Sequence, residues 1–271
     1  IGVSAIGMIL FTSRPVGDAM ATTIWGTASS WTLTALPLFV WMGEILFRTK
    51  LSENLFKGLS PWMQKLPGGL IHVNVVGCAL FAAISGSSAA TVATVGKMSI
   101  PELRKRKYPE KILLGSLAGS GTLGLLIPPS IILIIYGVAV QESIAKLFIA
   151  GIIPGIMIAL IFMSYVIIWS LINKKEMPVI LEEYSFLEKI KRSRQLLPVI
   201  ILISSVIGSI YTGIATATEA ASLGVVGALL LSFFQKTLTI DTFKSSLLGA
   251  TKTSCMIAFI LAGSTFLSLA M

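Results

Sequence analysis

The chain has 271 residues, of which 55% are hydrophobic and only 12% are charged. Because soluble domains carry about a quarter charged residues, this composition excludes an ordinary water-soluble protein and indicates one embedded in lipid. The net charge of +9 does not indicate nucleic-acid binding, because the basic residues lie in short segments between apolar runs rather than on one basic domain. Cys78 and Cys255 each lie in an apolar run, so we expect small buried residues rather than a disulfide or a metal site.

Apolar runs recur along the chain. A membrane-spanning helix needs roughly 20 mostly apolar residues, and residues 144–172, 196–217 and 247–271 meet this requirement. A shorter apolar run covers residues 33–47. We therefore predict an all-α integral membrane protein, a polytopic helical bundle whose chain crosses the bilayer several times.

The lysines and arginines predict the orientation of this bundle. Loops rich in these residues stay on the cytoplasmic side of a membrane. Most of the basic residues fall into four segments, which we predict to be cytoplasmic loops: 48–66, 97–111, 173–194 and 235–246. The connections predicted on the other side are residues 12–31, 140–147 and 215–219.

Residues 67–96 connect two loops that are both predicted to be cytoplasmic. Two full crossings need roughly 40 residues, whereas a single crossing would place the two loops on opposite sides. A re-entrant helical hairpin over about 67–100 satisfies both constraints. Its turn would fall at Ser85, Gly86, Ser87 and Ser88, where glycine permits a tight reversal. The alternative is that this cluster is a notch of small residues in one tilted helix.

Residues 111–140 are predicted to form a discontinuous helix. Pro128 and Pro129 interrupt it, because each proline removes a backbone donor and clashes with the preceding turn. Unwound backbone between half-helices is how secondary transporters build ion and substrate sites. Hydroxyl and carbonyl oxygens without carboxylates favour a monovalent cation such as Na+, since divalent ions recruit carboxylates. The alternative is a simple proline kink whose neighbouring glycines serve helix packing.

The isolated polar residues indicate structural roles. Glu44 is expected to pair with Arg48 at a membrane boundary, and Thr216 with Glu219 has the spacing of a helix capping box. His72 is the only histidine, and we expect a packed side chain rather than a proton relay. With a single histidine and no hydrolase or nucleotide-binding motif, the sequence does not indicate an enzyme.

Several stretches resemble the large permease (DctM-like) subunit of tripartite ATP-independent periplasmic (TRAP) transporters. They are LPLFVWMGEIL, GGLIHVNVVGCALFAAISGSSAATVATVGKMSIPELRKRKY, GTLGLLIPPSIILIIYGV, LFIAGIIPGIMIAL and GIATATEAAS, which follow in family order. The resemblance implies an elevator-type secondary transporter of the bacterial inner membrane, built from two inverted repeats. It also implies Na+-coupled import of an organic acid that a periplasmic substrate-binding protein delivers, with a small four-helix membrane subunit as a further partner.

The resemblance also assigns site residues. The hairpin tip corresponds to the family's first Na+ site, which the helix before the two prolines completes. The expected Na+-binding residues are Ser85, Gly86, Ser87, Ser120, Thr122 and Gly124. The expected substrate-binding residues, with the two serines contacting a substrate carboxylate, are Ser88, Pro128, Pro129 and Ser130.

The resemblance further divides the chain into three parts. Residues 1–172 are expected to hold the first repeat, which comprises a scaffold helix, the hairpin, the broken helix and a long helix. Residues 173–195 are expected to form a cytoplasmic linker, and residues 196–271 the start of a second, truncated repeat. We therefore expect a fragment of a longer protein that does not transport alone. Ala217 stands where the family usually has proline. A passive channel subunit and a structural membrane subunit are the alternatives.

Overall fold

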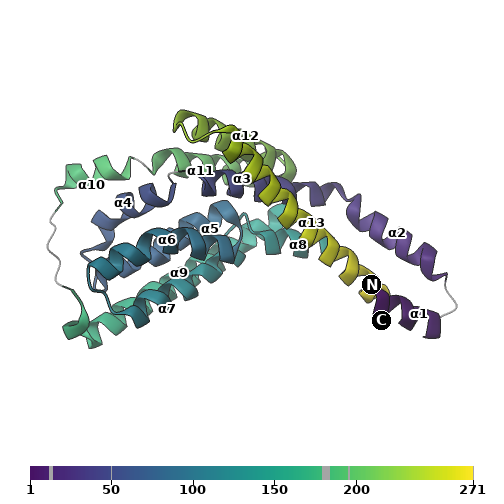
Figure 1. The fold of residues 1–271 in the computed structure, drawn as a ribbon, viewed down its shortest axis with the longest axis horizontal. Coiled ribbons are helices and arrows are strands. Elements are labelled where there is room, and N and C mark those ends of the chain that lie inside the picture. Colours follow the sequence, from purple (N-terminus) through teal and green to yellow (C-terminus); the bar gives the residue numbers. More distant parts are fainter. Residues whose placement is uncertain (12–14, 50, 179–183, 195, 271) are drawn as a thin grey trace.

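The computed structural model describes residues 1–11, 15–49, 51–178, 184–194 and 196–270. Every regular element in these ranges is a helix, as predicted (Figure 1). The elements are α1 (Gly2–Phe11), α2 (Val16–Ala28), η1 (Trp31–Thr34), α3 (Ala35–Phe47), α4 (Leu51–Met63), η2 (Gly69–Ile71), α5 (His72–Ser85), α6 (Ser88–Lys105), α7 (Glu110–Gly121), η3 (Thr122–Leu125), α8 (Ile131–Val140), α9 (Ile144–Ile172), η4 (Lys174–Glu176), α10 (Phe186–Ser193), α11 (Leu197–Tyr211), α12 (Ala217–Phe234) and α13 (Ile240–Ala270).

Three helices in the described ranges, α9, α12 and α13, are long and apolar enough to cross a membrane. Helix α2 and the η1–α3 segment pass the same test together, although the chain bends by 52° between them. The boundaries differ from those expected. The run over 196–217 contains the shorter α11, whereas α13 begins seven residues before the expected run over 247–271. Residue 271 lies outside the described residues.

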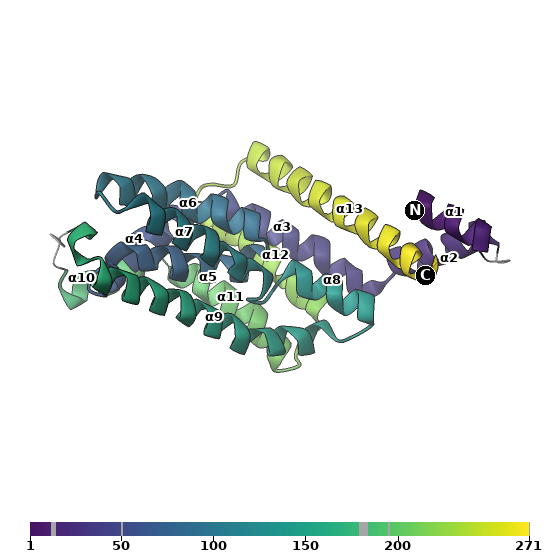
Figure 2. The ribbon, with the colours of Figure 1, turned by 90° about the horizontal axis from the view of Figure 1, so that it is seen from below.

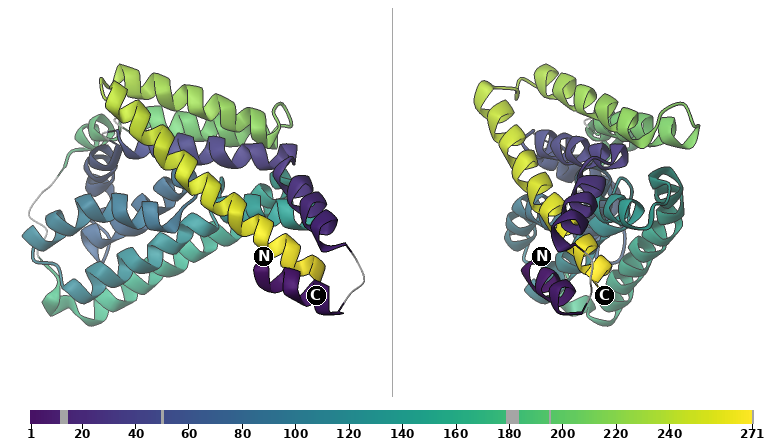
Figure 3. Two further views of the ribbon diagram at one scale, coloured as in Figure 1. Left: turned by 45° about the vertical axis from the view of Figure 1, so that its right-hand side comes forward. Right: turned by 90° about the vertical axis from the view of Figure 1, so that its right-hand side faces the viewer.

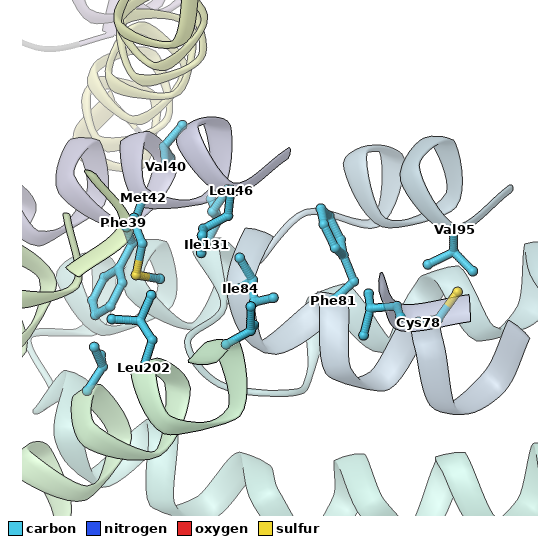
Figure 4. Close-up of a cluster of buried hydrophobic side chains, with 14 of the residues drawn as sticks. Phe39, Val40, Met42, Leu46, Cys78, Phe81, Ile84, Val95, Ile131 and Leu202 are labelled. Atoms are coloured by element: carbon cyan, nitrogen blue, oxygen red, sulfur yellow. The ribbon is translucent and has the colours of Figure 1, made fainter. Parts of the chain in front are cut away.

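Helix α3 lies at the centre of the molecule. It packs against α12 and α13 and also against α5 and α8, as Figure 1 shows. Figure 4 shows Phe39 and Met42 of α3 near Leu202 of α11, with Ile84 of α5 and Ile131 of α8 in the same buried cluster. Because lipid is as apolar as these side chains, van der Waals packing rather than exclusion of water stabilises such a cluster in a bilayer.

Helices α5, α6, α7 and α9 form a second group beside this centre (Figure 2). The pair α5 and α6 forms a helical hairpin, which packs on α7. The Asn74 side-chain amide on α5 donates to Leu113 O at 3.2 Å and to Ser116 Oγ at 3.0 Å, both on α7. Since an unpaired amide away from water is costly, these two bonds fix the hairpin relative to α7.

Helix α13 follows α12, packs on α3 and α2, and ends near α1, so the two ends of the described chain lie close together (Figure 3). Arg48 at the end of α3 forms the predicted ion pair with Glu44 and donates to Ser245 Oγ of α13 at 3.0 Å. Cys78 is buried, but Cys255 of α13 is exposed, which corrects the expectation that both are buried. The reason is that α13 packs along one face and leaves the other free.

Two predicted loops and one predicted connection contain helices. Helix α4 lies within residues 48–66, α10 within 173–194 and α2 within 12–31. Charge counting does not detect these helices. Helix α4, for example, buries Leu55 and Phe56 and exposes Lys57, as is typical of a helix at a polar–apolar boundary.

The expected linker over residues 173–195 is described only in part, since 179–183 and 195 fall outside the described residues. Its described part contains η4 and α10, and α10 packs on α4. The Trp62 indole N–H of α4 donates to Ser193 Oγ of α10 at 2.7 Å. This segment is therefore attached to the helix that precedes the hairpin.

Candidate functional site

The hairpin turns at the predicted serine–glycine cluster. Helix α5 ends at Ser85, and Gly86 follows in the left-handed region with φ +57°, a conformation that costs glycine little. Ser87 then takes an extended backbone and caps α6, since its hydroxyl accepts the Ala90 N–H at 3.5 Å. The chain thus reverses within two residues, and the ends of both helices face the turn.

Hydrogen bonds within the tip fix its conformation. The Thr91 hydroxyl donates to Ser87 O at 2.8 Å, and Thr91 Oγ1 lies 3.0 Å from Ser85 Oγ. The Ser87 N–H donates to Ser85 Oγ at 3.3 Å. Thr91 is fully buried, and the sequence reasoning did not single it out. Thr91 lies four residues after the N-cap Ser87, on the same face of α6, and this spacing could have indicated a contact with the turn.

The break follows α7 as predicted. Helix α7 tightens into the η3 turn, and α8 begins only at Ile131. Ser130 links the two sides of the break, because its hydroxyl donates to Leu125 O at 2.6 Å across the two prolines. Its side chain is fully buried. The break is therefore an ordered stretch of backbone rather than a kink in a continuous helix.

The tip and the break contact each other through their backbones. The Ile131 N–H donates to Gly86 O at 3.3 Å. A Cβ at Gly86 would lie 2.8 Å from Pro129 O, and a Cβ at Gly124 would lie 2.9 Å from the Ser88 nitrogen. Real Cβ atoms do not approach so closely, so glycine is required at both positions. The structure thus brings together the residues expected at the tip and most of those expected at the break.

Two buried hydroxyls beside this contact have no hydrogen-bond partner. They belong to Ser88, at the start of α6, and to Ser120, which is fully buried at the end of α7. An unpaired buried hydroxyl costs roughly 1–3 kcal/mol in a protein. A bound cation with oxygen ligands would offset that cost. The available oxygens are neutral, and no group of three or more His, Cys, Asp or Glu side chains suited to a metal occurs within the described ranges.

Two expected residues lie less favourably for binding. Thr122 is exposed, and its hydroxyl donates to Gly119 O at 2.7 Å. Pro128 faces α9, since its Cγ lies 3.5 Å from where a Cβ on Gly151 would be. Both follow from the tightened η3 turn, which rotates the backbone between α7 and α8. Their proximity in sequence to the other site residues does not bring their side chains to the tip.

Helix α3 supports the tip from another direction. A Cβ at Gly43 would lie 3.0 Å from the Ser85 Cα and 3.2 Å from Ile84 O. The end of α5 therefore packs directly on the backbone of α3. The sequence reasoning missed Gly43, because a single glycine in an apolar helix gives no sign of which helix approaches it.

The other polar residues have structural roles. The Thr216 N–H donates to Glu219 Oε2 at 2.8 Å, which completes the predicted capping box at the start of α12. His72 is fully buried, and its Nε2 lies 2.8 Å from Pro67 O. Like the ion pair of Glu44 with Arg48, these contacts stabilise helix ends.

The chain is similar to known membrane proteins along its whole length. A family model described as "Tripartite ATP-independent periplasmic transporter, DctM component" matches residues 1–271. The C4-dicarboxylate TRAP transporter large permease protein DctM of Pseudomonas aeruginosa is 34% identical over 263 residues, 97% of this chain and 61% of that protein. The sialic acid TRAP transporter large permease protein SiaM of Vibrio cholerae is 32% identical over 264 residues, 96% of this chain and 61% of that protein.

A third relative is named for a different substrate. The ectoine/5-hydroxyectoine TRAP transporter large permease protein UehC of Ruegeria pomeroyi is 36% identical over 204 residues, 73% of this chain and 46% of that protein. The chain spans less than two thirds of the length of each of these relatives. The relatives are membrane permeases, and the long apolar helices of this chain agree with a membrane-embedded member of their family. The chain therefore belongs to the DctM family, the large permease components of tripartite ATP-independent periplasmic transporters.

Proposed function

We propose that the protein containing this chain couples Na+ entry to the import of an organic acid. A substrate-binding protein outside the bacterial inner membrane delivers the acid, and a small four-helix membrane subunit completes the complex. The family supports this proposal, as do the substrates for which relatives are named, among them C4-dicarboxylate, sialic acid and 2,3-diketo-L-gulonate. Na+ and the acid are both transported substrates, so neither is a resident cofactor.

The observation that carries the proposal is the contact between the hairpin tip and the break, with two unpaired hydroxyls buried beside it. The proposed Na+ site takes oxygens from the tip and from the end of α7, where Ser120 Oγ has no partner. The C-terminal end of α5 adds a partial negative charge at the same place. The residues assigned to Na+ are Ser85, Gly86, Ser87, Ser120, Thr122 and Gly124, of which Thr122 is exposed.

The substrate carboxylate is proposed to bind on the other side of the tip. The N-terminal ends of α6 and α8 lie there, and a helix N-terminus favours an anion. Ser88 begins α6 and Ser130 directly precedes α8, so we assign both to contact with the carboxylate. Pro128 and Pro129 complete the residues assigned to the substrate, although Pro128 faces α9. Ordering of the tip by Na+ would create the carboxylate site, which couples the two substrates.

Movement in this proposal is a rigid displacement of the hairpin and the broken helix against α3, α11 and α12. A cavity of about 600 Å³ lies between η1, the α8–α9 connection and the start of α12. It opens at the end of the molecule opposite the basic segments, where a delivered acid would enter. This location suits an importer that receives its substrate from outside.

The test is Ser120→Ala in the full-length protein with its small subunit. Without Na+, the variant is expected to be at least as stable as the parent, because an unpaired buried hydroxyl is removed. Its thermal midpoint is expected to lose the rise that Na+ causes in the parent. Ser205→Ala is the matched control, since its hydroxyl already donates to Leu202 O at 2.8 Å away from the tip. An undiminished Na+ response in Ser120→Ala would contradict the site.

Uptake into proteoliposomes tests the coupling itself. An inward Na+ gradient and the cognate binding protein are both expected to be required for accumulation of the acid. Uptake that needs Na+ but no binding protein would remove the delivery step. Uptake that ignores Na+ would refute the coupling and favour a passive channel.

A further inference from the structure

A second cavity lies at the opposite end of the hairpin from the tip. It has a volume of about 320 Å³ and lies between the start of the hairpin, the α6–α7 connection and the end of α9. This end of the molecule carries the basic segments that predict the cytoplasmic side. The lining residues that matter here are Lys65, Gly68, Tyr108, Ser170, Leu171 and Lys174.

A buried hydroxyl without a partner lines this cavity. Ser170 is only 4% exposed, and its Oγ has no hydrogen-bond partner. Gly68, with φ +102°, leaves space beside it, because a Cβ there would lie 3.0 Å from Ser170 Oγ and 2.6 Å from Val166 Cγ1. The Ser170 proton is therefore free to be donated to a ligand group in the cavity.

Tyr108 supplies a second donor. Its hydroxyl oxygen accepts the Leu70 N–H at 3.0 Å. Within the described ranges, the hydroxyl proton of Tyr108 is not donated to another residue. Burial raises the pKa of Tyr108, against the opposing effects of the Leu70 hydrogen bond and the charge of Arg106. The hydroxyl therefore keeps its proton at neutral pH and can donate it into the cavity.

Charge makes the cavity selective for anions. Lys65 and Lys174 line it and are exposed at its opening. No aspartate or glutamate is among its described lining residues. The carbonyl of Pro67 already interacts with His72 Nε2. Two ammonium groups and two hydroxyl donors, without a competing carboxylate, are the donor set that a phosphate group requires.

The surroundings favour a phosphate that belongs to a lipid. Leu171 and Ile172 at the end of α9 are 48% and 76% exposed, so an apolar surface begins directly beside the lysines. Basic pockets between membrane helices on the cytoplasmic side bind anionic headgroups. We propose that this cavity binds a phosphate-bearing anion, the headgroup of an anionic phospholipid whose acyl chains lie along α9. Free phosphate shares the same chemistry and is the alternative source.

The experiment uses the full-length protein, delipidated in a neutral detergent and free of Na+, so that its result does not depend on the proposed ion coupling. Phosphatidylglycerol, phosphatidylcholine and inorganic phosphate are titrated separately, and binding is measured by native mass spectrometry and by the thermal midpoint. Phosphatidylglycerol is expected to bind and to raise the midpoint. Lys65→Gln with Lys174→Gln should weaken this binding by roughly 25-fold, at about fivefold for each lysine near a membrane surface.

The control variant is Lys175→Gln, which removes one lysine charge beside Lys174 but outside the cavity lining, and which should bind as the parent does. Ser170→Ala should weaken phosphatidylglycerol binding while leaving the lipid-free protein at least as stable, which separates a ligand contact from a structural role. If inorganic phosphate raises the thermal midpoint, phosphatidylglycerol does not, and the rise needs both lysines, the ligand is a soluble anion. Equal binding of the two lipids, or equal loss in Lys175→Gln and the double variant, would overturn the proposal.

Discussion

The contact between the hairpin tip and the break predicts a large effect for Gly86→Ala. Gly86 has φ +57°, and its added Cβ would lie 2.8 Å from Pro129 O and 3.0 Å from the Ile131 nitrogen. Both of these atoms belong to the backbone, so neither can move aside by changing rotamer. The substitution must therefore either distort the tip or separate it from the break.

The loss of stability expected for Gly86→Ala has two parts. A left-handed conformation costs an alanine roughly 1–2 kcal/mol, and overpacking against a fixed neighbour costs about 1–3 kcal/mol. Gly213→Ala isolates the first part, because Gly213 has φ +72° and nothing within 4 Å of its Cβ position. Gly124→Ala isolates the second, since its Cβ would lie 2.9 Å from the Ser88 nitrogen without a left-handed backbone.

The assay is thermal unfolding of the full-length protein in detergent. At about 2–4 °C per kcal/mol, Gly86→Ala should lower the midpoint by at least about 2 °C more than Gly213→Ala. Gly115→Ala is a further control, since Gly115 has nothing within 4 Å and alanine in a helix is favourable by about 0.5–1 kcal/mol. Equal midpoints for Gly86→Ala and Gly213→Ala would refute the close contact between tip and break.

Two further predictions concern contacts between helices. Asn74→Ala should lower the free energy of unfolding by about 1–3 kcal/mol, because it leaves Leu113 O and Ser116 Oγ without the Asn74 donor; an unchanged midpoint in thermal unfolding would contradict the role of this amide. Arg48→Ala should lower the free energy of unfolding more than Glu44→Gln does, since Arg48 also donates to Ser245 Oγ and O of α13. Chemical denaturation of both variants measures this difference, and an equal loss would mean that only the ion pair matters.

Local chemistry made much of the candidate site predictable. Gly86 between serines indicated a turn, and Pro128 with Pro129 indicated a break, because each residue type acts on its own backbone. The capping box of Thr216 with Glu219 was predictable for the same reason. These features need only neighbours within about four positions along the chain.

The features that escaped prediction depend on distant neighbours. Gly43 lies about forty residues before Ser85, and nothing in its local sequence shows that the end of α5 packs on it. The exposure of Thr122 follows from the η3 turn. Pro128 and Pro129 indicate that the helix breaks, but they do not indicate which side chains of the turn before them become exposed. Helices α4 and α10 were expected as loops, because charge counts do not register the apolar residues that α4 buries or the contacts of α10 with Trp62.

The hairpin and the broken helix are incomplete without each other. The carbonyl of Gly86 at the hairpin turn needs a donor, and Ile131, the first residue after the break, needs an acceptor for its N–H; the bond between these two groups meets both needs. The glycines at 86 and 124 make this approach possible, because a Cβ at either position would lie less than 3 Å from the opposing backbone. The tip and the break are therefore expected to move together, and an ion that ties Ser85 and Ser87 of the tip to Ser120 would act on both at once. This is why the proposed displacement is assigned to the pair as a unit, with α3 as the surface against which it moves.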